Sequence, residues 1–201
     1  MPAMPAMPAM NESVYRSTLD SPLGPLRLVS TSLGLAAISL PEGQEWHERW
    51  MRRVFPRAQI LSILPGGSAH AEVVRQLDQY FEGRRRVFDL PLDLRGSPFQ
   101  KVVWSNVARI PFGRIASYSE IAHLVGRPGA SRAVGTANGS NPIPLVIPCH
   151  RVVGADGSLT GYGGGLPAKR WLLVHEGVFR GSAPQPVQMS LFARGGAPPA
   201  V

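Results

Sequence analysis

Cys149 is the only cysteine of this 201-residue chain, and its neighbours are unusual for a structural thiol. A free cysteine is most often a small buried hydrophobe. Here the flanking residues are Pro148, His150 and Arg151, and nearby His and Arg side chains favour the thiolate, which is the reactive form. Three prolines between residues 142 and 148 stiffen the approach to the thiol. The pattern indicates a nucleophilic cysteine.

Glu176 supplies a carboxylate that could support this nucleophile. It follows His150 by 26 residues and closes an apolar segment that starts at Pro167, which we expect to be a helix. One carboxylate on an apolar helix predicts a buried acid that orients a base. Cys149, His150 and Glu176 would then form a relay in which the histidine activates the thiol. These residues alone leave the electrophile open.

The elements that must position this relay lie in residues 94–180, which we predict to be a helical domain. Ser97-Pro98 predicts a helix start, with serine as N-cap and proline in the first turn. Ser117 and Glu120 form a capping box that opens a short helix ending at Val125. With a further helix over 130–138, this gives the pattern of a helix-turn-helix. The inward stripe of the first helix is expected to contain Phe99, Val102, Val103, Val107 and Ile110.

The predicted helix over 130–138 consists mainly of small residues, with Arg132 as its one long basic side chain. Small side chains let a helix backbone approach a narrow minor groove, and they suit base-edge reading in the wide groove less well. A helix packed tightly in the protein core would show the same composition. The pattern leaves both interpretations open.

Residues 13–93 are typical of a small α/β domain. Apolar segments separated by turn residues predict strands at 14–19, 26–29 and 35–40. Helical spacing of apolar residues predicts helices at 42–54 and 69–82. Residues 1–10 repeat Met-Pro-Ala, so we expect a disordered leader over residues 1–12. Residues 181–201 are rich in Gly, Pro and Ala, so we expect a flexible tail there.

Charge is distributed unevenly between the two halves. Residues 1–93 carry ten basic and ten acidic side chains, whereas residues 94–201 carry eleven basic and three acidic ones. This asymmetry favours a polyanionic partner for the second half. Genomic composition bias is the alternative, because Arg outnumbers Lys 19 to 2.

Several protein classes are excluded by composition. A single cysteine cannot form an internal disulfide or a zinc site with several Cys ligands, so we expect a reducing cytoplasm and no metal. No apolar run approaches the roughly 20 residues of a membrane-spanning helix, and we find no signal peptide.

The run Ile147-Pro148-Cys149-His150-Arg151-Val152 resembles the active-site signature of the O6-alkylguanine-DNA alkyltransferases, also called methylated-DNA–protein-cysteine methyltransferases. The resemblance spans about residues 14–178. Its other motifs, all in the family's order, are Ser21-Pro22-Leu23-Gly24-Pro25-Leu26, Phe99-Gln100 with Val103-Trp104, Ile110-Pro111-Phe112-Gly113, Ser117-Tyr118, Arg132-Ala133-Val134-Gly135, Ala137-Asn138, Asn141-Pro142, Gly164-Gly165-Leu166, and Leu172-Leu173 with His175-Glu176.

The resemblance implies an N-terminal ribonuclease-H-like α/β domain followed by a helical DNA-binding domain with a helix-turn-helix. It implies direct-reversal DNA repair without a cofactor. The protein would bind double-stranded DNA through the minor groove as a monomer and flip out O6-alkylguanine. It would then transfer the alkyl group irreversibly to Cys149 in a single turnover. O4-alkylthymine is expected as a second substrate.

The family's residue roles carry over by position. His150 would remove the thiol proton through a water, Glu176 would orient His150, and Asn141 would brace the turn around Cys149. Tyr118 would donate its hydroxyl to the guanine ring. Backbone groups of Cys149, Val152 and Gly163 would contact the base. Arg132 would fill the gap left by that base, and the remaining expected DNA contacts are Ala130, Ala133, Gly135 and Arg151.

Gly163 departs from family members that carry Ser at this position. Glycine keeps the backbone N–H but loses a hydroxyl and gains mobility. The run Gly161-Tyr162-Gly163-Gly164-Gly165 therefore indicates a pliable lid that could admit alkyl groups larger than methyl.

The C-terminal tail contains an apolar pair within small and polar residues. Gln188-Met189-Ser190-Leu191-Phe192 resembles the short motif with which bacterial repair proteins bind the sliding clamp, with Gln188, Leu191 and Phe192 as the contacts. The alternative is a tail that docks on its own domain.

Two other functions compete with alkyl transfer. A thiol hydrolase could use the same Cys149, His150 and Glu176, but it leaves the basic half of the chain unexplained. A non-reactive protein that recognises alkylated bases would not need Cys149.

Overall fold

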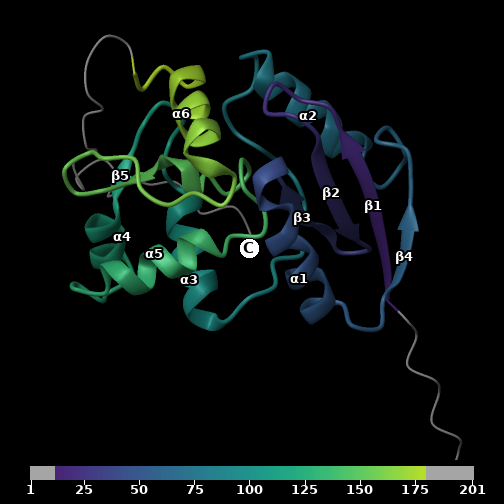
Figure 1. Cartoon of the computed structure of the whole chain (residues 1–201), viewed down its shortest axis with the longest axis horizontal. Helices are drawn as coiled ribbons and strands as arrows, with labels where there is room; N and C mark the ends of the chain where they lie inside the picture. Colours follow the sequence, from purple (N-terminus) through teal and green to yellow (C-terminus); the bar gives the residue numbers. More distant parts are fainter. Residues whose placement is uncertain (1–11, 180–201) are drawn as a thin grey trace, which may run out of the picture.

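The computed structural model describes residues 12–179 and shows two domains side by side, an α/β domain and a mainly helical one (Figure 1). The tail motif lies outside the described residues. The first domain contains β1 (Ser13–Leu19), β2 (Leu26–Thr31), β3 (Gly34–Ser39), the 3₁₀ turn η1 (Pro41–Gly43), α1 (Gln44–Val54), β4 (Gln59–Ser62) and α2 (Ala71–Phe81). The second contains α3 (Pro98–Ala108), β5 (Ala116–Ser117), α4 (Tyr118–Leu124), α5 (Ser131–Gly139), η2 (Cys149–Arg151), β6 (Val152–Val153) and α6 (Gly165–His175).

The N-terminal sheet has the order β3-β2-β1-β4. Its first three strands are antiparallel neighbours, whereas β4 pairs with β1 in parallel. Alternating side chains of the strands enter two different cores: Val29 packs with Trp50 of α1, and Leu28 belongs with Leu77 of α2 to the main core. The two helices therefore cover opposite faces of the sheet. The sequence predicted three of the strands and both helices, but missed β4, whose four residues are mostly exposed and show no alternation.

The helices of the second domain begin where their capping residues predict. Both Ser97 and Ser117 form complete capping boxes, at the starts of α3 and α4. The predicted inward stripe of α3 is wrong at Val102, which is 47% exposed. Trp104 takes the buried place instead, because its indole N–H reaches the carbonyl of Ala137 in α5 at 2.7 Å.

The exposures along α5 distinguish between the two interpretations of its small residues. Val134 and Ala137 are buried, whereas Arg132 and Ala133 are exposed. One face of the helix therefore packs on the core, and the opposite face offers small side chains to the outside. Helix α6 begins at Gly165, so the predicted start, Pro167, lies in its first turn.

One hydrophobic core continues through both domains. Leu77 and Tyr80 of α2 belong to the same buried cluster as Val107 of α3 and Leu172 of α6. The two-domain fold predicted from the family resemblance is confirmed, while its exact domain limits stay predictions. None of the helices within residues 12–179 is long and apolar enough to cross a membrane.

Candidate active site

Cys149 begins the short helix η2 at the end of a proline-rich loop. Within that loop Leu145 is buried and has a φ of 75°, a backbone conformation that costs a branched residue roughly 1–3 kcal/mol. Asn141 braces the loop at both ends. Its amide N–H donates to the carbonyl of Ile147 at 2.7 Å, and its side-chain oxygen accepts from the backbone N–H of Ile143 at 3.0 Å. The geometry agrees with the bracing role expected for Asn141.

His150 and Glu176 form the predicted pair. The distance from His150 Nε2 to Glu176 Oε1 is 2.8 Å, and both side chains are fully buried. Because an ionised carboxylate can only accept, Nε2 carries the proton and Nδ1 keeps its lone pair. Nδ1 has no partner among the residues described. The imidazole is therefore oriented as a base with a free nitrogen.

The charges around the pair keep Glu176 ionised and His150 neutral. Burial alone would raise the pKa of Glu176, but the hydrogen bond from His150 and the guanidinium of Arg151 outweigh it and hold that pKa well below its usual range. Burial lowers the pKa of His150, and the opposing effect of Glu176 is insufficient to reverse this.

Arg151 is not where the sequence analysis placed it. Its exposure is only 5%, and it turns inward instead of toward DNA. Its guanidinium donates to Glu176 through Nε and Nη2, both at 2.9 Å, and to the carbonyl of Ile110 at 2.6 Å. The expected DNA contact is therefore wrong for this residue. A buried carboxylate needs a compensating charge, and Arg151 provides it.

The Cys149 thiol also differs from expectation, because the effect of burial is larger than that of the nearby groups that favour a thiolate. Burial raises the pKa of Cys149 to about 11, although the Asn141 amide and the charge of Lys169 act in the opposite direction. The cause of the error is the direction of Arg151, whose charge is used by Glu176. In this state the thiol is neutral and needs a base to become reactive.

Lys169 is a functional candidate that the sequence analysis missed. It is fully buried in α6, and its ammonium donates to the carbonyls of Val152 at 2.6 Å and Thr160 at 2.7 Å. It thus links the active-site turn to the loop before Tyr162. Burial lowers its pKa to about 8. The signal was available, since Lys169 shares one helical face with Leu172, Leu173 and Glu176.

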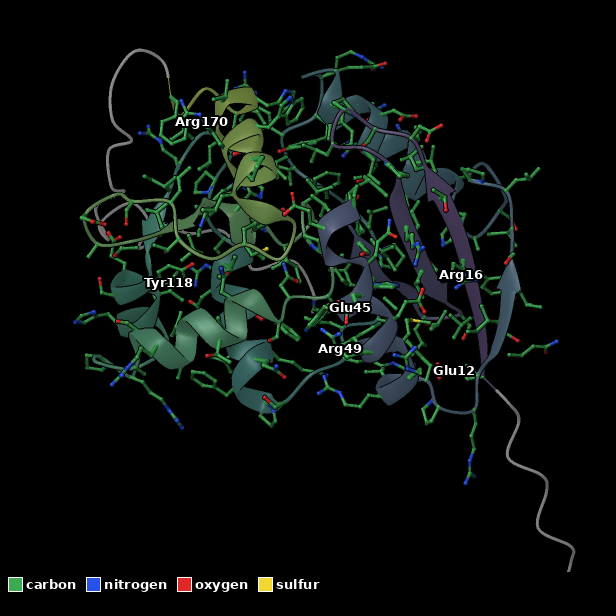
Figure 2. All side chains as sticks on the ribbon, viewed as in Figure 1. Glu12, Arg16, Glu45, Arg49, Tyr118 and Arg170 are labelled. Atoms are coloured by element: carbon green, nitrogen blue, oxygen red, sulfur yellow. The ribbon has the colours of Figure 1, made fainter. Side chains whose placement is uncertain are left out.

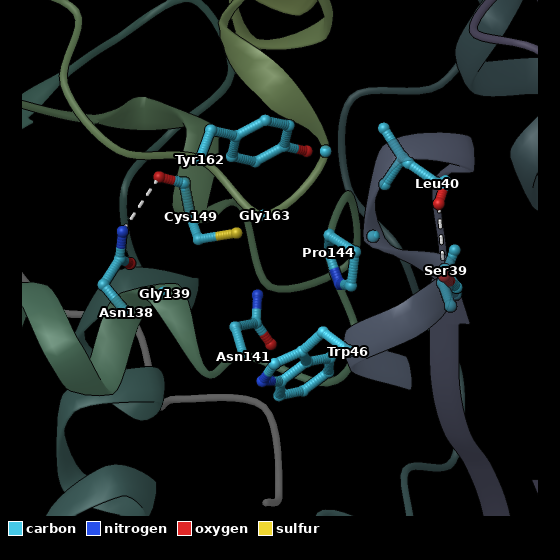
Figure 3. Close-up of a pocket in the computed structure, with 13 residues that line it drawn as sticks. Ser39, Leu40, Trp46, Asn138, Gly139, Asn141, Pro144, Cys149, Tyr162 and Gly163 are labelled. Carbon is cyan, nitrogen blue, oxygen red and sulfur yellow. Dashed lines mark hydrogen bonds between the residues drawn. The ribbon is translucent and has the colours of Figure 1, made fainter. Parts of the chain in front are cut away.

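Two cavities lie near the sulfur and share a wall made by Gly139, Tyr162 and Gly163. The inner cavity encloses about 160 Å³ beside Cys149, and Figure 3 shows the sulfur facing this space, with Trp46 and Pro144 on its border. Its wall includes Ser39 and Leu40, so the N-terminal domain contributes to the site. The outer cavity is larger and more open, with about 670 Å³, and Tyr118 and Arg132 line it.

Comparisons with known proteins agree on one family. Residues 14–94 match the ribonuclease-like domain of 6-O-methylguanine DNA methyltransferase, and residues 98–178 match its DNA-binding domain. The chain belongs to the 6-O-methylguanine DNA methyltransferase family.

Individual relatives cover most of both chains. A "Methylated-DNA--protein-cysteine methyltransferase" of Mycobacterium tuberculosis is 44% identical over 81% of this chain and 92% of its own length. The protein of that name from Shigella flexneri is 42% identical over 79% and 93%. A crystal structure of Mycobacterium tuberculosis OGT in complex with DNA has a TM-score of 0.71 at 44% identity, covering 81% of this chain and 92% of that chain.

Three residues to which the family resemblance gives contacts with DNA or the base line the outer cavity, namely Tyr118, Arg132 and Gly135. Tyr118 starts α4, far from the N-terminal sheet (Figure 2), and its hydroxyl lies 3.3 Å from the carbonyl of Thr160. Arg132 and Ala133 are exposed on α5, and Ala130 and Gly135 are half-buried. A Cβ at Gly135 would make an ordinary van der Waals contact with the ring of Tyr118 at 3.8 Å, so this residue lies directly beside that ring.

The backbone groups expected to contact the base are partly engaged. The carbonyl of Cys149 accepts from Asn138 at 3.2 Å, and that of Val152 accepts from Lys169. Each carbonyl retains a second lone pair. At Gly163 a Cβ would meet nothing closer than the Gly139 oxygen at 3.9 Å, so the space expected there is present.

The rest of the lid is packed more closely than its composition predicted. A Cβ on Gly164 would approach the side chain of Leu40 at 2.6 Å, and one on Gly43 would approach the Gly163 oxygen at 2.9 Å. These glycines therefore let the lid contact the N-terminal domain. The sequence analysis also gave no role to Tyr162, whose buried hydroxyl has no partner in the described part of the chain.

Proposed function

We propose that this protein repairs DNA by direct reversal, flipping O6-alkylguanine out of the duplex and transferring its alkyl group to Cys149. The observation that carries the proposal is the His150–Glu176 pair beside a buried cysteine. The exposed small-residue face of α5 lies in the same domain. Family membership supports the assignment, since the curated relatives above carry the name of this methyltransferase.

The chemistry needs only groups of this chain and the substrate. Nδ1 of His150 accepts the thiol proton through a water, and the sulfur attacks the alkyl carbon in line with the O6–carbon bond. As that bond breaks, the Tyr118 hydroxyl donates to the ring and stabilises the negative charge of the leaving guanine. The guanine finally gains one proton, which balances the proton lost by the thiol.

The reaction ends in a thioether on Cys149. Water does not readily hydrolyse a thioether, and Cys149 is the only cysteine in the sequence. Each chain therefore reacts once. We also propose O4-alkylthymine as a substrate, because its alkyl carbon is likewise joined to a ring through oxygen.

The proposed DNA contact places α5 in the minor groove. The small residues Ala130, Ala133 and Gly135 allow a close backbone approach. Arg132 projects from this face beside the outer cavity, and its side chain would fill the gap that the everted base leaves in the duplex. The base would enter through the outer cavity, and a shift of Tyr162 and Gly163 would open it onto Cys149. The protein would act as a monomer in the cytoplasm, where a free thiol stays reduced.

Intact mass measurement after incubation with an O6-methylguanine duplex tests this proposal. We expect a gain of one methyl group per chain, mapped to Cys149 by peptide analysis, and no gain for Cys149→Ala. Unmodified protein with cleaved substrate would instead indicate a thiol hydrolase. Tight binding without transfer would indicate a recognition protein. An O4-methylthymine duplex in a parallel reaction tests the second substrate.

The tail motif at Gln188, Leu191 and Phe192 supports a second, independent contact with the bacterial sliding clamp. Two apolar anchors on a tether would give weak binding with a high local concentration on DNA. A tail peptide should bind purified clamp, and the double change Leu191→Ala with Phe192→Ala should abolish that binding. No affinity, or affinity unaffected by the double change, would reject the contact.

A further inference from the structure

Tyr80 connects the N-terminal domain directly to the relay. It lies in α2, is fully buried, and its hydroxyl donates to Glu176 Oε1 at 2.8 Å. A carboxylate cannot donate, so the direction of this bond is fixed. Oε1 therefore accepts from three donors, namely Tyr80, His150 and Nη2 of Arg151. Two of these come from the active-site turn itself, and only Tyr80 comes from the other domain.

The position of the Tyr80 hydroxyl is fixed by contacts along the whole residue. Its ring packs against Phe88 and Phe112, with centroid distances of 5.4 and 6.2 Å. Its backbone carbonyl accepts from Nε2 of His175 at 2.8 Å. The adjacent residues His175 and Glu176, at the end of α6, thus hold Tyr80 at its two ends. These contacts hold the phenol beside Glu176.

Tyr80 and His150 donate to the same acceptor, Oε1 of Glu176. Glu176 Oε2 has its own donors, Nε of Arg151 at 2.9 Å and the backbone N–H of Gly113 at 3.2 Å. Removing the phenol would therefore leave the carboxylate ionised, but it would leave more negative charge at the oxygen that holds His150. The strength with which Glu176 attracts a second proton on the imidazole depends on this charge.

We propose that Tyr80 is a positioning residue of the alkyl-transfer reaction, through which the N-terminal domain sets the orientation and basicity of His150. The inference rests on the proposed function for its effect on alkyl transfer, but its effect on His150 can be observed without any reaction. Tyr80 is not hydrogen-bonded to Cys149 or His150 among the bonds described, and it acts on them only through Glu176.

The direction of the effect follows from the groups around the relay. Arg151 and Lys169 face it with positive charge and Glu176 with negative charge, and the other titratable groups around it are the Cys149 thiol, the phenols of Tyr80 and Tyr162 and the imidazole of His175. Of these, only Tyr80 and Arg151 share Oε1 with His150 among the bonds described. In Tyr80→Phe the less neutralised carboxylate stabilises the imidazolium, so His150 becomes protonated at higher pH and loses its action as a base there.

Two measurements on full-length protein test this. NMR titration of the His150 imidazole, assigned by comparison with His150→Gln, should show the Tyr80→Phe midpoint raised by about half to one pH unit. The acid limb of the single-turnover rate should move in the same direction, with less than about a threefold loss on the alkaline plateau. Phe88→Leu is the matched control, because it loosens the same ring cluster without removing a donor, and it should leave the midpoint unchanged.

Site-specific 3,5-difluorotyrosine at position 80 gives a second, opposite perturbation that keeps the ring and the hydroxyl. Its more acidic phenol is a stronger donor and should lower the His150 midpoint. This variant decides the question if Tyr80→Phe does not fold. An unchanged midpoint in the folded variants, or an equal change in Phe88→Leu, would overturn the assignment. If the wild-type protein transfers no alkyl group, the proposed function fails, while the NMR titration still decides the role of Tyr80.

Discussion

His47 and His150 are buried histidines, one in each domain, and they differ in what surrounds their rings. Neither ring nitrogen of His47 has a hydrogen-bond partner among the described residues, whereas His150 donates to Glu176 at 2.8 Å. His70 lies between these cases, because its Nδ1 is 2.6 Å from the hydroxyl of Ser17. Burial lowers the pKa of both His47 and His70 to about 4.

Burial alone therefore makes a histidine neutral, but it does not fix the tautomer or the orientation of the ring. In the proposed mechanism His150 acts as a base because the carboxylate fixes its tautomer and orientation and would stabilise its protonated form. Glu176 can do this only because Arg151, Tyr80 and the Gly113 N–H satisfy it in turn. In the N-terminal domain, His47 and His70 pack instead within the fold.

The largest effect is expected from a variant that removes the difference between His150 and His47. Glu176→Gln should make His150 resemble His47 by taking away the negative charge that orients it. We expect the single-turnover rate to fall about 100- to 1,000-fold. The folded state should also lose about 3–5 kcal/mol, because Arg151 is left as an uncompensated buried charge. Rapid-quench kinetics and urea denaturation measure the two losses, and a rate within about threefold of wild type would refute the relay.

Acid unfolding tests the other half of the comparison, the buried histidines of the N-terminal domain. His47 and His70 have folded pKa values of about 4 against 6.5 in the unfolded chain, so the unfolded state binds more protons below pH 6.5. Their stability contribution is complete above pH 6.5 and is lost as the pH falls toward 4. The loss amounts to about 3 kcal/mol for each group. Denaturation curves across this pH range in the variant His70→Gln should show one proton less taken up on unfolding, and an uptake equal to that of the wild type would contradict the buried neutral state of His70.

Arg132→Ala tests a site outside the relay and should have the smallest effect. Losing the side chain that replaces the flipped base should slow repair of an O6-methylguanine duplex about tenfold, equivalent to roughly 1.4 kcal/mol. Reaction with free O6-benzylguanine needs no flipping and should stay within about twofold of wild type. Parallel rate measurements with the two substrates check this, and equal slowing of both would contradict the place assigned to Arg132.

Much of the local structure and the relay could be predicted from sequence because the signals are local. Ser97 and Ser117 mark helix starts through bonds to residues three positions ahead, and Glu176 stands out as one carboxylate on an apolar helix. Strand β4 was missed because four mostly exposed residues carry no pattern.

The remaining site residues depend on contacts between distant segments. Tyr80 and Glu176 are 96 positions apart, so no spacing rule connects them. Arg151 was assigned to DNA because its charge is visible in the sequence, whereas its inward direction is set by Glu176 and the carbonyl of Ile110. Lys169 differs from these two, because its place on the apolar face of α6 was visible in the sequence and only its acceptors, Val152 and Thr160, were not.

The central claim is that Cys149 is consumed when it receives the alkyl group, and product stoichiometry tests it most directly. A large excess of O6-methylguanine duplex is incubated with a known amount of protein, and restored guanine is counted over time. We expect repair to stop when one guanine has been restored for each active chain. Restored guanine that continues to rise past the amount of protein would show turnover and contradict irreversible transfer to Cys149.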